Sequence, residues 1–165
     1  MDDFIWCGVH EFENTVISDL RSTFRVGKEE TACFQYLGLQ LQQSLMGISL
    51  DQYHYIDNLK EIDISGIKNQ DLTSSTNDHL KDELRSKVGQ LLWVANQTRP
   101  DISFDVSSAA VSIKSSTLQD VVHINKIIRK VKNNCLPLQF FSVGKDTKIV
   151  AYTDAAFANL VCCLV

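Results

Sequence analysis

Residues 84–107 read LRSKVGQLLWVANQTRPDISFDVS, and this stretch decides the fold. Its first half has helical spacing, with apolar residues at Leu84, Val88, Leu91, Leu92 and Ala95. Pro100 breaks the pattern, because the residue before a proline, here Arg99, is biased away from helical geometry. Proline also suits the first turn of a helix. The stretch therefore predicts a helix, a corner at TRPD and a second helix.

The helical pattern continues to residue 131. The second helix has apolar positions at Ile102, Val106, Ala109, Ala110 and Ile113. Thr117 and Asp120 resemble a capping box in which Asp replaces Glu, and they introduce a third helix. Its apolar positions are Leu118, Val121, Ile124, Ile127, Ile128 and Val131. Because the connections are short, we expect the three helices to pack antiparallel.

The residues before this region alternate between strand and helix signals. Phe4 to Cys7 predicts a short buried strand. A helix follows from Glu11 to about Gly27, with an apolar stripe of Phe12, Val16, Leu20 and Phe24. Residues 33–50 predict a β-hairpin that turns at SLMG and has a bulge or close backbone approach at Leu37-Gly38.

Further elements are expected on both sides of the helices. Residues 51–64 predict a helix with Asp51 as a candidate N-cap, and residues 65–79 a polar loop. The helix has an apolar stripe of Tyr55, Ile56, Leu59 and Ile62. At the C-terminal end, residues 138–143 and 148–153 predict a hairpin joined at Gly144-Lys145-Asp146. Trp6 and Trp93 lie in apolar segments and are expected in the core.

Composition is that of a folded protein without export signals. The chain has 165 residues, 44% hydrophobic and 22% charged, which excludes disorder. A net charge of −4 argues against a protein that works alone on nucleic acid, although a local basic face is compatible with it. The five cysteines include no C-x-x-C pair, and neither a signal peptide nor a membrane-spanning stretch is visible. We expect an intracellular protein, in the cytoplasm or nucleus.

The first eight residues, MDDFIWCG, contain the adjacent carboxylates Asp2 and Asp3. Two carboxylates held close together repel each other unless a cation lies between them, and Mg²⁺ prefers such oxygen ligands. Two Mg²⁺ ions can stabilise the attacking and leaving oxygens of a phosphoryl transfer. The same pair also fits a solvated chain end. The four histidines share no metal-ligand spacing.

Four segments together resemble the reverse transcriptase of copia-type LTR retrotransposons, over roughly residues 2–160. MDDFIWCG resembles the family's tyrosine-x-Asp-Asp strand. FQYLGLQL with GISLDQYHYIDNLKEIDI resembles the primer-grip hairpin and the helix after it. Residues 84–107 resemble the segment in which a helix ends at Thr-Arg-Pro-Asp-Ile, and IVAYTDAAFANL resembles the opening strand of the RNase H domain.

The resemblance implies an α+β fold in three parts. Residues 1–50 are expected to be a partial palm, with a strand, a helix and the primer-grip hairpin. Residues 51–134 are expected to form antiparallel thumb or connection helices, with the polar loop 65–79. Residues 135–165 are expected to be the truncated start of an RNase H-like domain, with the C-terminal hairpin. A partial palm leaves a sheet edge exposed.

The resemblance also implies the site residues. Asp2 and Asp3 match the metal-binding carboxylates of the polymerase, and Asp154 matches the first acidic Mg²⁺ ligand of RNase H. The primer-grip turn that holds the primer end corresponds to Tyr36, Leu37 and Gly38. One further helix face is either a phosphate-binding surface or an ordinary solvated face. Its basic residues are Lys126, Arg129 and Lys130.

The implied activity is RNA-directed DNA synthesis with Mg²⁺ on a template–primer duplex, within a Pol polyprotein. The family also uses an upstream palm carboxylate, nucleotide-binding fingers and further RNase H acids, to which no residue here corresponds, and the tail LVCCLV departs from the family pattern. We therefore expect a truncated fragment that is inactive alone and binds Mg²⁺ weakly. The alternative is a non-catalytic module that binds nucleic acid or other Pol segments. No membrane partner is expected.

Overall fold

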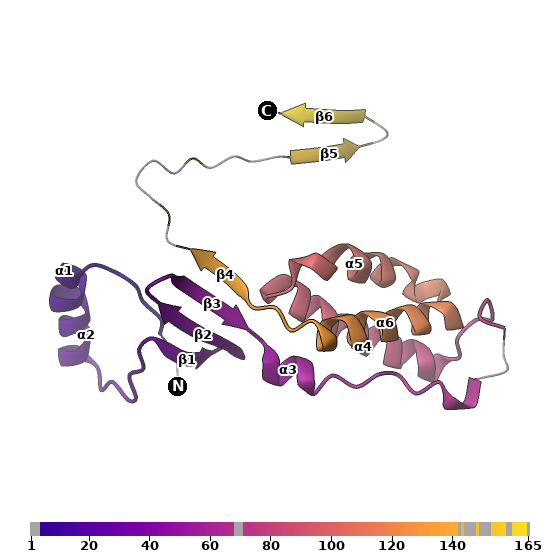
Figure 1. Cartoon of the computed structure of the whole chain (residues 1–165), viewed down its shortest axis with the longest axis horizontal. Helices are drawn as coiled ribbons and strands as arrows, with labels where there is room; N and C mark the ends of the chain where they lie inside the picture. Colours follow the sequence, from indigo (N-terminus) through magenta and orange to yellow (C-terminus); the bar gives the residue numbers. More distant parts are fainter. Residues whose placement is uncertain are drawn as a thin grey trace.

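The computed structural model describes residues 4–67, 71–141, 143, 148, 153–157 and 160–164, with Ile67 and the last two ranges in backbone only. In sequence order, a short N-terminal helix precedes three strands, a small helix and a three-helix unit (Figure 1). The chain then returns to the sheet with a fourth strand. This mixture of helix and antiparallel sheet agrees with the expected content. Assignment of its parts to a polymerase palm and thumb stays a prediction.

The N-terminal segment differs from expectation in two ways. Residues 4–7 are not a strand, because no described strand takes up their backbone hydrogen bonds. The predicted helix is present as α1 (His10–Phe12), the π-helical η1 (Glu13–Ile17) and α2 (Ser18–Thr23), and it ends before Gly27. Only Ile17 of this helix is buried, and Phe24 of the predicted stripe is 64% exposed. The apolar stripe thus remains largely uncovered.

Residues 33–51 form three strands, where the sequence predicted two. They are β1 (Cys33–Tyr36), β2 (Leu39–Ser44) and β3 (Gly47–Asp51), each antiparallel to the next. The turn predicted at SLMG joins β2 to β3. The predicted bulge at Leu37-Gly38 was wrong: φ is +48° at Leu37 and +79° at Gly38, and the two residues form the loop between β1 and β2. Two positive φ values in a two-residue loop are typical of a type I′ hairpin turn.

The fourth strand, β4 (Leu138–Phe141), pairs with β3 and completes the order β1-β2-β3-β4. The C-terminal hairpin was predicted to pair residues 138–143 with 148–153, and this pairing stays a prediction. Residues 144–147 and 149–152, with the predicted turn, lie outside the described residues. β5 (Thr153–Phe157) pairs with β6 (Leu160–Leu164), so the tail contributes a strand.

Gly47 is required where β3 meets β4. A Cβ atom at this position would lie 2.0 Å from the carbonyl oxygen of Phe140, and φ is +142°. Because both the space and the backbone conformation exclude a side chain, glycine permits the close approach of the two strands.

The two faces of the sheet differ in chemistry. Strand alternation and the observed register place most apolar side chains on one face, with Gln43 among them, and most glutamine and serine side chains on the other, with Phe141 among them. None of the apolar side chains is fully buried. They are Phe34, Tyr36, Leu39, Leu41, Ile48, Leu50, Leu138 and Phe140. The outer strands are β1 and β4.

The three predicted helices are confirmed. They are α4 (Asp78–Gln97), α5 (Ser103–Ser112) and α6 (Leu118–Asn133), and consecutive helices run in opposite directions (Figure 1). The predicted break at TRPD is η3 (Pro100–Ile102), and η4 (Ile113–Ser115) ends α5. The predicted capping box is also present, because the backbone N–H of Thr117 donates to Asp120 Oδ2 over 2.7 Å.

The core lies between these helices. Each fully buried leucine, isoleucine or valine contributes roughly 1.5–3 kcal/mol to folding. Trp93 was expected in the core but is 39% exposed, and Trp6 is half-buried beside Phe12. The largest apolar side chains that are less than 2% exposed are Leu84, Leu91, Ile102, Ile124, Ile128, Val94, Val106, Val121 and Val131.

Residues 58–64, here called the strap, replace most of the helix predicted for residues 51–64. α3 (Tyr53–Asp57) is short, and the strap runs from it beside α6 without regular structure (Figure 1). Leu59 and Ile62 are buried as predicted. The amide of Asn125, itself 1% exposed, donates to the carbonyl of Ile62 and accepts from its N–H, both over 2.9 Å. This pairing with a distant side chain replaces the hydrogen bonds of a helix.

Two local predictions nearby are confirmed in part. Gln52, not Asp51, is the N-cap of α3, but Asp51 Oδ1 accepts a hydrogen bond from the N–H of Tyr53, the first residue of α3, over 3.1 Å. The polar loop ends where Asn77 caps α4 by accepting from the N–H of Leu80, and its residues 68–70 lie outside the described residues. η2 (Ser65–Ile67) is a single turn at its start.

Asn125→Ala tests the strap contact. Removing the amide leaves two buried backbone groups of Ile62 without partners, and each such group costs about 1–3 kcal/mol. We therefore expect the free energy of unfolding to fall by about 2–4 kcal/mol, measured by urea denaturation. Asn133→Ala, on the exposed side of α6, is the control and should change it by less than about 0.5 kcal/mol. Equal losses in the two variants would contradict this account.

Candidate nucleic-acid interface

The three predicted primer-grip residues lie together at one end of the sheet. Tyr36 ends β1 and is half-buried, while Leu37 is 65% exposed at the tip of the turn. No atom lies within 4 Å of a Cβ built on Gly38, so the tip is open on that side. Gln40 pairs with Asp51, which places this turn at the end of the sheet from which the chain enters α3. The turn thus presents an uncharged tip at the end of the sheet that leads to the helices.

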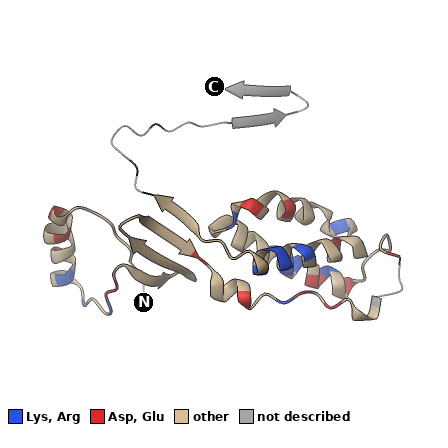
Figure 2. Cartoon of the chain, in the orientation of Figure 1, with Lys and Arg blue, Asp and Glu red and all other residues tan. Residues whose placement is uncertain are grey.

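The three predicted basic residues share the exposed face of α6, but two of them already have acidic partners. Arg129 Nη2 donates to Glu61 Oε2 over 2.7 Å, and its Nε lies 3.0 Å from both carboxylate oxygens. Lys130 Nζ lies 3.6 Å from Asp105 Oδ2. Lys126 has no ion pair among the described residues. Figure 2 shows the Lys and Arg residues of α6 in blue as a band along the helix.

The electrostatics of the Glu61–Arg129 pair follow from its geometry. The hydrogen bonds from Arg129, together with its charge and that of Lys132, hold the pKa of the Glu61 carboxyl below its usual value. The hydrogen bonds to Glu61 and the negative charge of that carboxylate raise the pKa of Arg129. Both side chains are about half exposed, so solvent weakens the attraction between them.

The predicted metal-binding carboxylates are not tested by the geometry. Asp2 and Asp3 lie outside the described residues, and Asp154 is described in backbone only, opposite Cys163 in β5–β6. Within the described ranges, no three side chains of His, Cys, Asp or Glu form a group suited to a metal ion. Carboxylate oxygens remain the donor type that Mg²⁺ prefers, and its binding by these residues stays a prediction.

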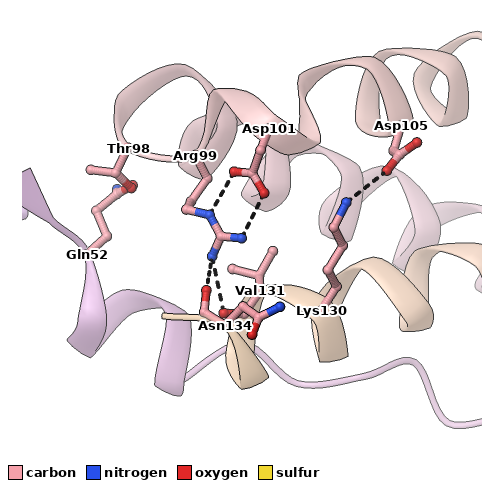
Figure 3. Close-up of polar contacts among 8 residues, drawn as sticks. All are labelled: Gln52, Thr98, Arg99, Asp101, Asp105, Lys130, Val131 and Asn134. Carbon is pink, nitrogen blue, oxygen red and sulfur yellow. Dashed lines mark hydrogen bonds and ion pairs between the residues drawn. The ribbon is translucent and has the colours of Figure 1, made fainter. Parts of the chain in front are cut away.

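Sequence reasoning treated Arg99 only as the residue before a proline. In the structure its side chain is 3% exposed, at the corner between α4 and α5 (Figure 3). Its Nε and Nη2 donate to the two carboxylate oxygens of Asp101 over 2.8 and 2.9 Å. Its Nη1 donates to the carbonyls of Val131 and Asn134, at the C-terminal end of α6. An Arg-x-Asp pair across a proline, between two apolar helices, is the sequence signal that identifies it.

Two further hydrogen bonds involve the residues that follow β3. Thr98 Oγ1 donates to Gln52 Oε1 over 2.8 Å, and Tyr53 Oη donates to the carbonyl of Cys135 over 2.9 Å. Gln52 is 2% exposed, and its Nε2 has no partner in the described part of the chain. The residues that leave β3 are therefore tied to the end of α4 and to the segment that enters β4.

Comparison with known proteins identifies the origin of the chain. It is 30% identical over 137 residues to a transposon Ty5-1 protein of Saccharomyces cerevisiae. The sequence is retrotransposon-derived. The match covers 74% of this chain and 44% of the yeast protein. No family model and no solved structure matches the chain.

The comparison confirms the expected relation to a transposable element. The copia-type, reverse-transcriptase and RNase H assignments of this retrotransposon-derived chain stay predictions. In the ranges that the structure describes, no helix combines the length and the apolar character needed to cross a membrane.

Arg99→Met tests the corner. The change removes hydrogen bonds to two carbonyls and leaves Asp101 without its partner, so we expect a loss of about 2–4 kcal/mol in the free energy of unfolding. Arg99→Lys should recover only part of it, because an ammonium lacks the planar fork that fits the carboxylate. Arg85→Met is the matched control in an exposed pair with Asp82, and it should cost less than about 1 kcal/mol. Urea denaturation measures all three variants.

Lowering the pH should reveal how much the Arg99–Asp101 ion pair contributes to the stability of the fold. The hydrogen bonds and charge of Arg99 hold the pKa of the Asp101 carboxyl below its usual value. A carboxyl with a lowered folded-state pKa stabilises the fold above its unfolded-state pKa, near 4, and loses that contribution as the pH falls through its folded-state pKa. Between about pH 5 and about pH 2.5 the urea midpoint of the wild type should therefore fall further than that of Asp101→Asn. Parallel pH profiles would contradict the assignment.

Proposed function

We propose that this retrotransposon-derived chain is a segment of a copia-type Pol polyprotein that holds an RNA–DNA template–primer duplex. The observation that carries the proposal is the Tyr36–Leu37–Gly38 turn. It matches the family's primer grip in sequence, its tip is exposed, and it lies at the end of the sheet that leads to the helices. Protein contacts to sugar and phosphate fix the register of a duplex without reading its sequence.

The parent reaction is RNA-directed DNA synthesis, in which a primer 3′-hydroxyl attacks the α-phosphate of a deoxynucleotide. In this proposal Asp2 and Asp3 hold the Mg²⁺ that neutralises developing charge on the phosphate, and Asp154 belongs to the RNase H site. The role of the described residues is to position the duplex. Positioning supplies a large part of the rate of such reactions, because the reacting atoms must lie within about 3–3.5 Å of each other.

We also propose that the 165-residue chain does not add nucleotides by itself. The resemblance assigns Asp2 and Asp3 to the polymerase site, but it matches no residue here to the additional palm carboxylate or to the fingers. Loss of members of a catalytic unit commonly lowers the rate by several orders of magnitude.

Primer extension tests this second proposal. We expect no incorporation of deoxynucleotide on an RNA template with Mg²⁺, and no difference between the wild type and Asp2→Asn/Asp3→Asn. Incorporation by the wild type that the double variant lacks would overturn the proposal of inactivity and would support a catalytic role for the two carboxylates.

Hybrid binding tests the primer-grip assignment. Leu37→Asp places a negative charge at the tip of the turn, where aspartate tolerates the positive φ better than leucine does. We expect it to weaken binding of an RNA–DNA hybrid by about three- to tenfold at low salt, measured by fluorescence anisotropy. Leu45→Asp is the matched control, because Leu45 is fully exposed at the β2–β3 turn at the opposite end of the sheet. Equal effects of the two variants would contradict a specific role for the turn.

The second candidate function is a module that binds other Pol segments. The half-exposed apolar face of the sheet favours it, because exposed apolar area of this kind is typical of protein contacts. Under this reading, the wild type would fail to bind hybrid even at low salt, where phosphate contacts are strongest.

A further inference from the structure

The basic face of α6 lies between two acidic elements. Arg129 and Lys130 are adjacent in sequence, yet their side chains reach in opposite directions around the helix. Arg129 reaches Glu61 in the strap, and Lys130 reaches Asp105 in α5. Lys126 lies one turn earlier on the same exposed face. Each of the two paired cations is thus held by a carboxylate of a different segment.

We infer that Glu61 and Asp105 mask the basic face of α6, so that a nucleic-acid phosphate must displace them to reach Arg129 and Lys130. The inference rests on the proposed function, because it concerns regulation of the same duplex-binding surface. Phosphate and carboxylate compete for the same donors, since both offer paired oxygens to a guanidinium.

The geometry makes displacement feasible. The Arg129–Glu61 side chains are 52% and 41% exposed, and the Lys130–Asp105 side chains are 46% and 38% exposed. Exposed pairs of this kind contribute little to stability, whereas a duplex offers a closely spaced row of phosphates. A duplex therefore has enough negative charge for a phosphate to take the place of each carboxylate. If phosphates replaced both carboxylates, Arg129 and Lys130 would be free to act with Lys126 as one continuous phosphate-binding surface.

The strap does not depend on the Glu61 charge for its position. Leu59 and Ile62 are buried, and Asn125 holds both backbone groups of Ile62. Lys132 Nζ also donates to the carbonyl of Leu59 over 2.8 Å. Glu61→Gln should therefore remove the charge and leave the strap in place, which makes it a clean test of masking.

The experiment measures binding of a 20-base-pair RNA–DNA hybrid to the full chain by fluorescence anisotropy across a salt series. Glu61→Gln should tighten binding by about three- to tenfold at low salt and steepen the salt dependence by about 0.9 in the slope of log K against log salt, as expected for one additional phosphate contact. Asp105→Asn should act in the same way through Lys130. A second substitution, Arg129→Ala, should abolish the gain in the Glu61→Gln background and change the wild type little.

Glu30→Gln is the matched control. It removes one carboxylate from an exposed pair with a lysine, because Glu30 Oε1 lies 2.7 Å from Lys28 Nζ in the N-terminal segment. It changes the net charge by the same amount at a site far from α6 in the sequence. An equal gain from Glu30→Gln and Glu61→Gln would show a bulk charge effect and overturn the inference. Thermal melting of each variant confirms that the fold is retained.

The two proposals fail in different ways. If the wild type binds hybrid and Leu37→Asp weakens it, but Glu61→Gln behaves as the wild type does, masking is wrong and the proposed function stands. If Glu61→Gln binds where the wild type does not, masking is supported. If no variant binds at low salt, both proposals are wrong.

Discussion

The buried guanidinium of Arg99 is the contact on which the arrangement of the helices depends. It fixes the corner between α4 and α5 through Asp101, and it takes up carbonyls that the end of α6 leaves without intrahelical partners. A cation at the C-terminal end of a helix also offsets the negative end of the helix dipole. Because α6 leads directly into β4, the same contact sets where the fourth strand leaves the helical unit.

The features that the sequence predicted correctly are those encoded by neighbouring residues. Apolar spacing located α4, α5 and α6, Pro100 located the break, and the Thr117–Asp120 pair located the start of α6. Each of these signals involves residues within four positions of each other, so it can be recognised without knowing which distant residues the segment contacts. Alternation of apolar and polar residues located residues 33–50 as strands for the same reason, but it merged β1 and β2 into one strand.

The features that failed depend on partners far away in sequence. The strap has helical apolar spacing, but Asn125 takes up the backbone of Ile62 and replaces the helix. Residues 4–7 have the composition of a strand, but no described strand pairs with them. For the candidate site, spacing grouped Lys126, Arg129 and Lys130 correctly. It could not reveal that Glu61 and Asp105, on other segments, face two of them.

The pairing of β3 with β4 has a consequence for how the molecule is assembled. Leu50 lies opposite Leu138, so residues 52–137, with all three long helices, form an insertion whose two ends emerge side by side from one sheet. Bringing such distant strands together is entropically costly until the intervening chain has become compact. We therefore expect the helices to fold first and thereby to bring β4 next to β3. Because the two ends of this insertion lie side by side, its length can change with little effect on the sheet.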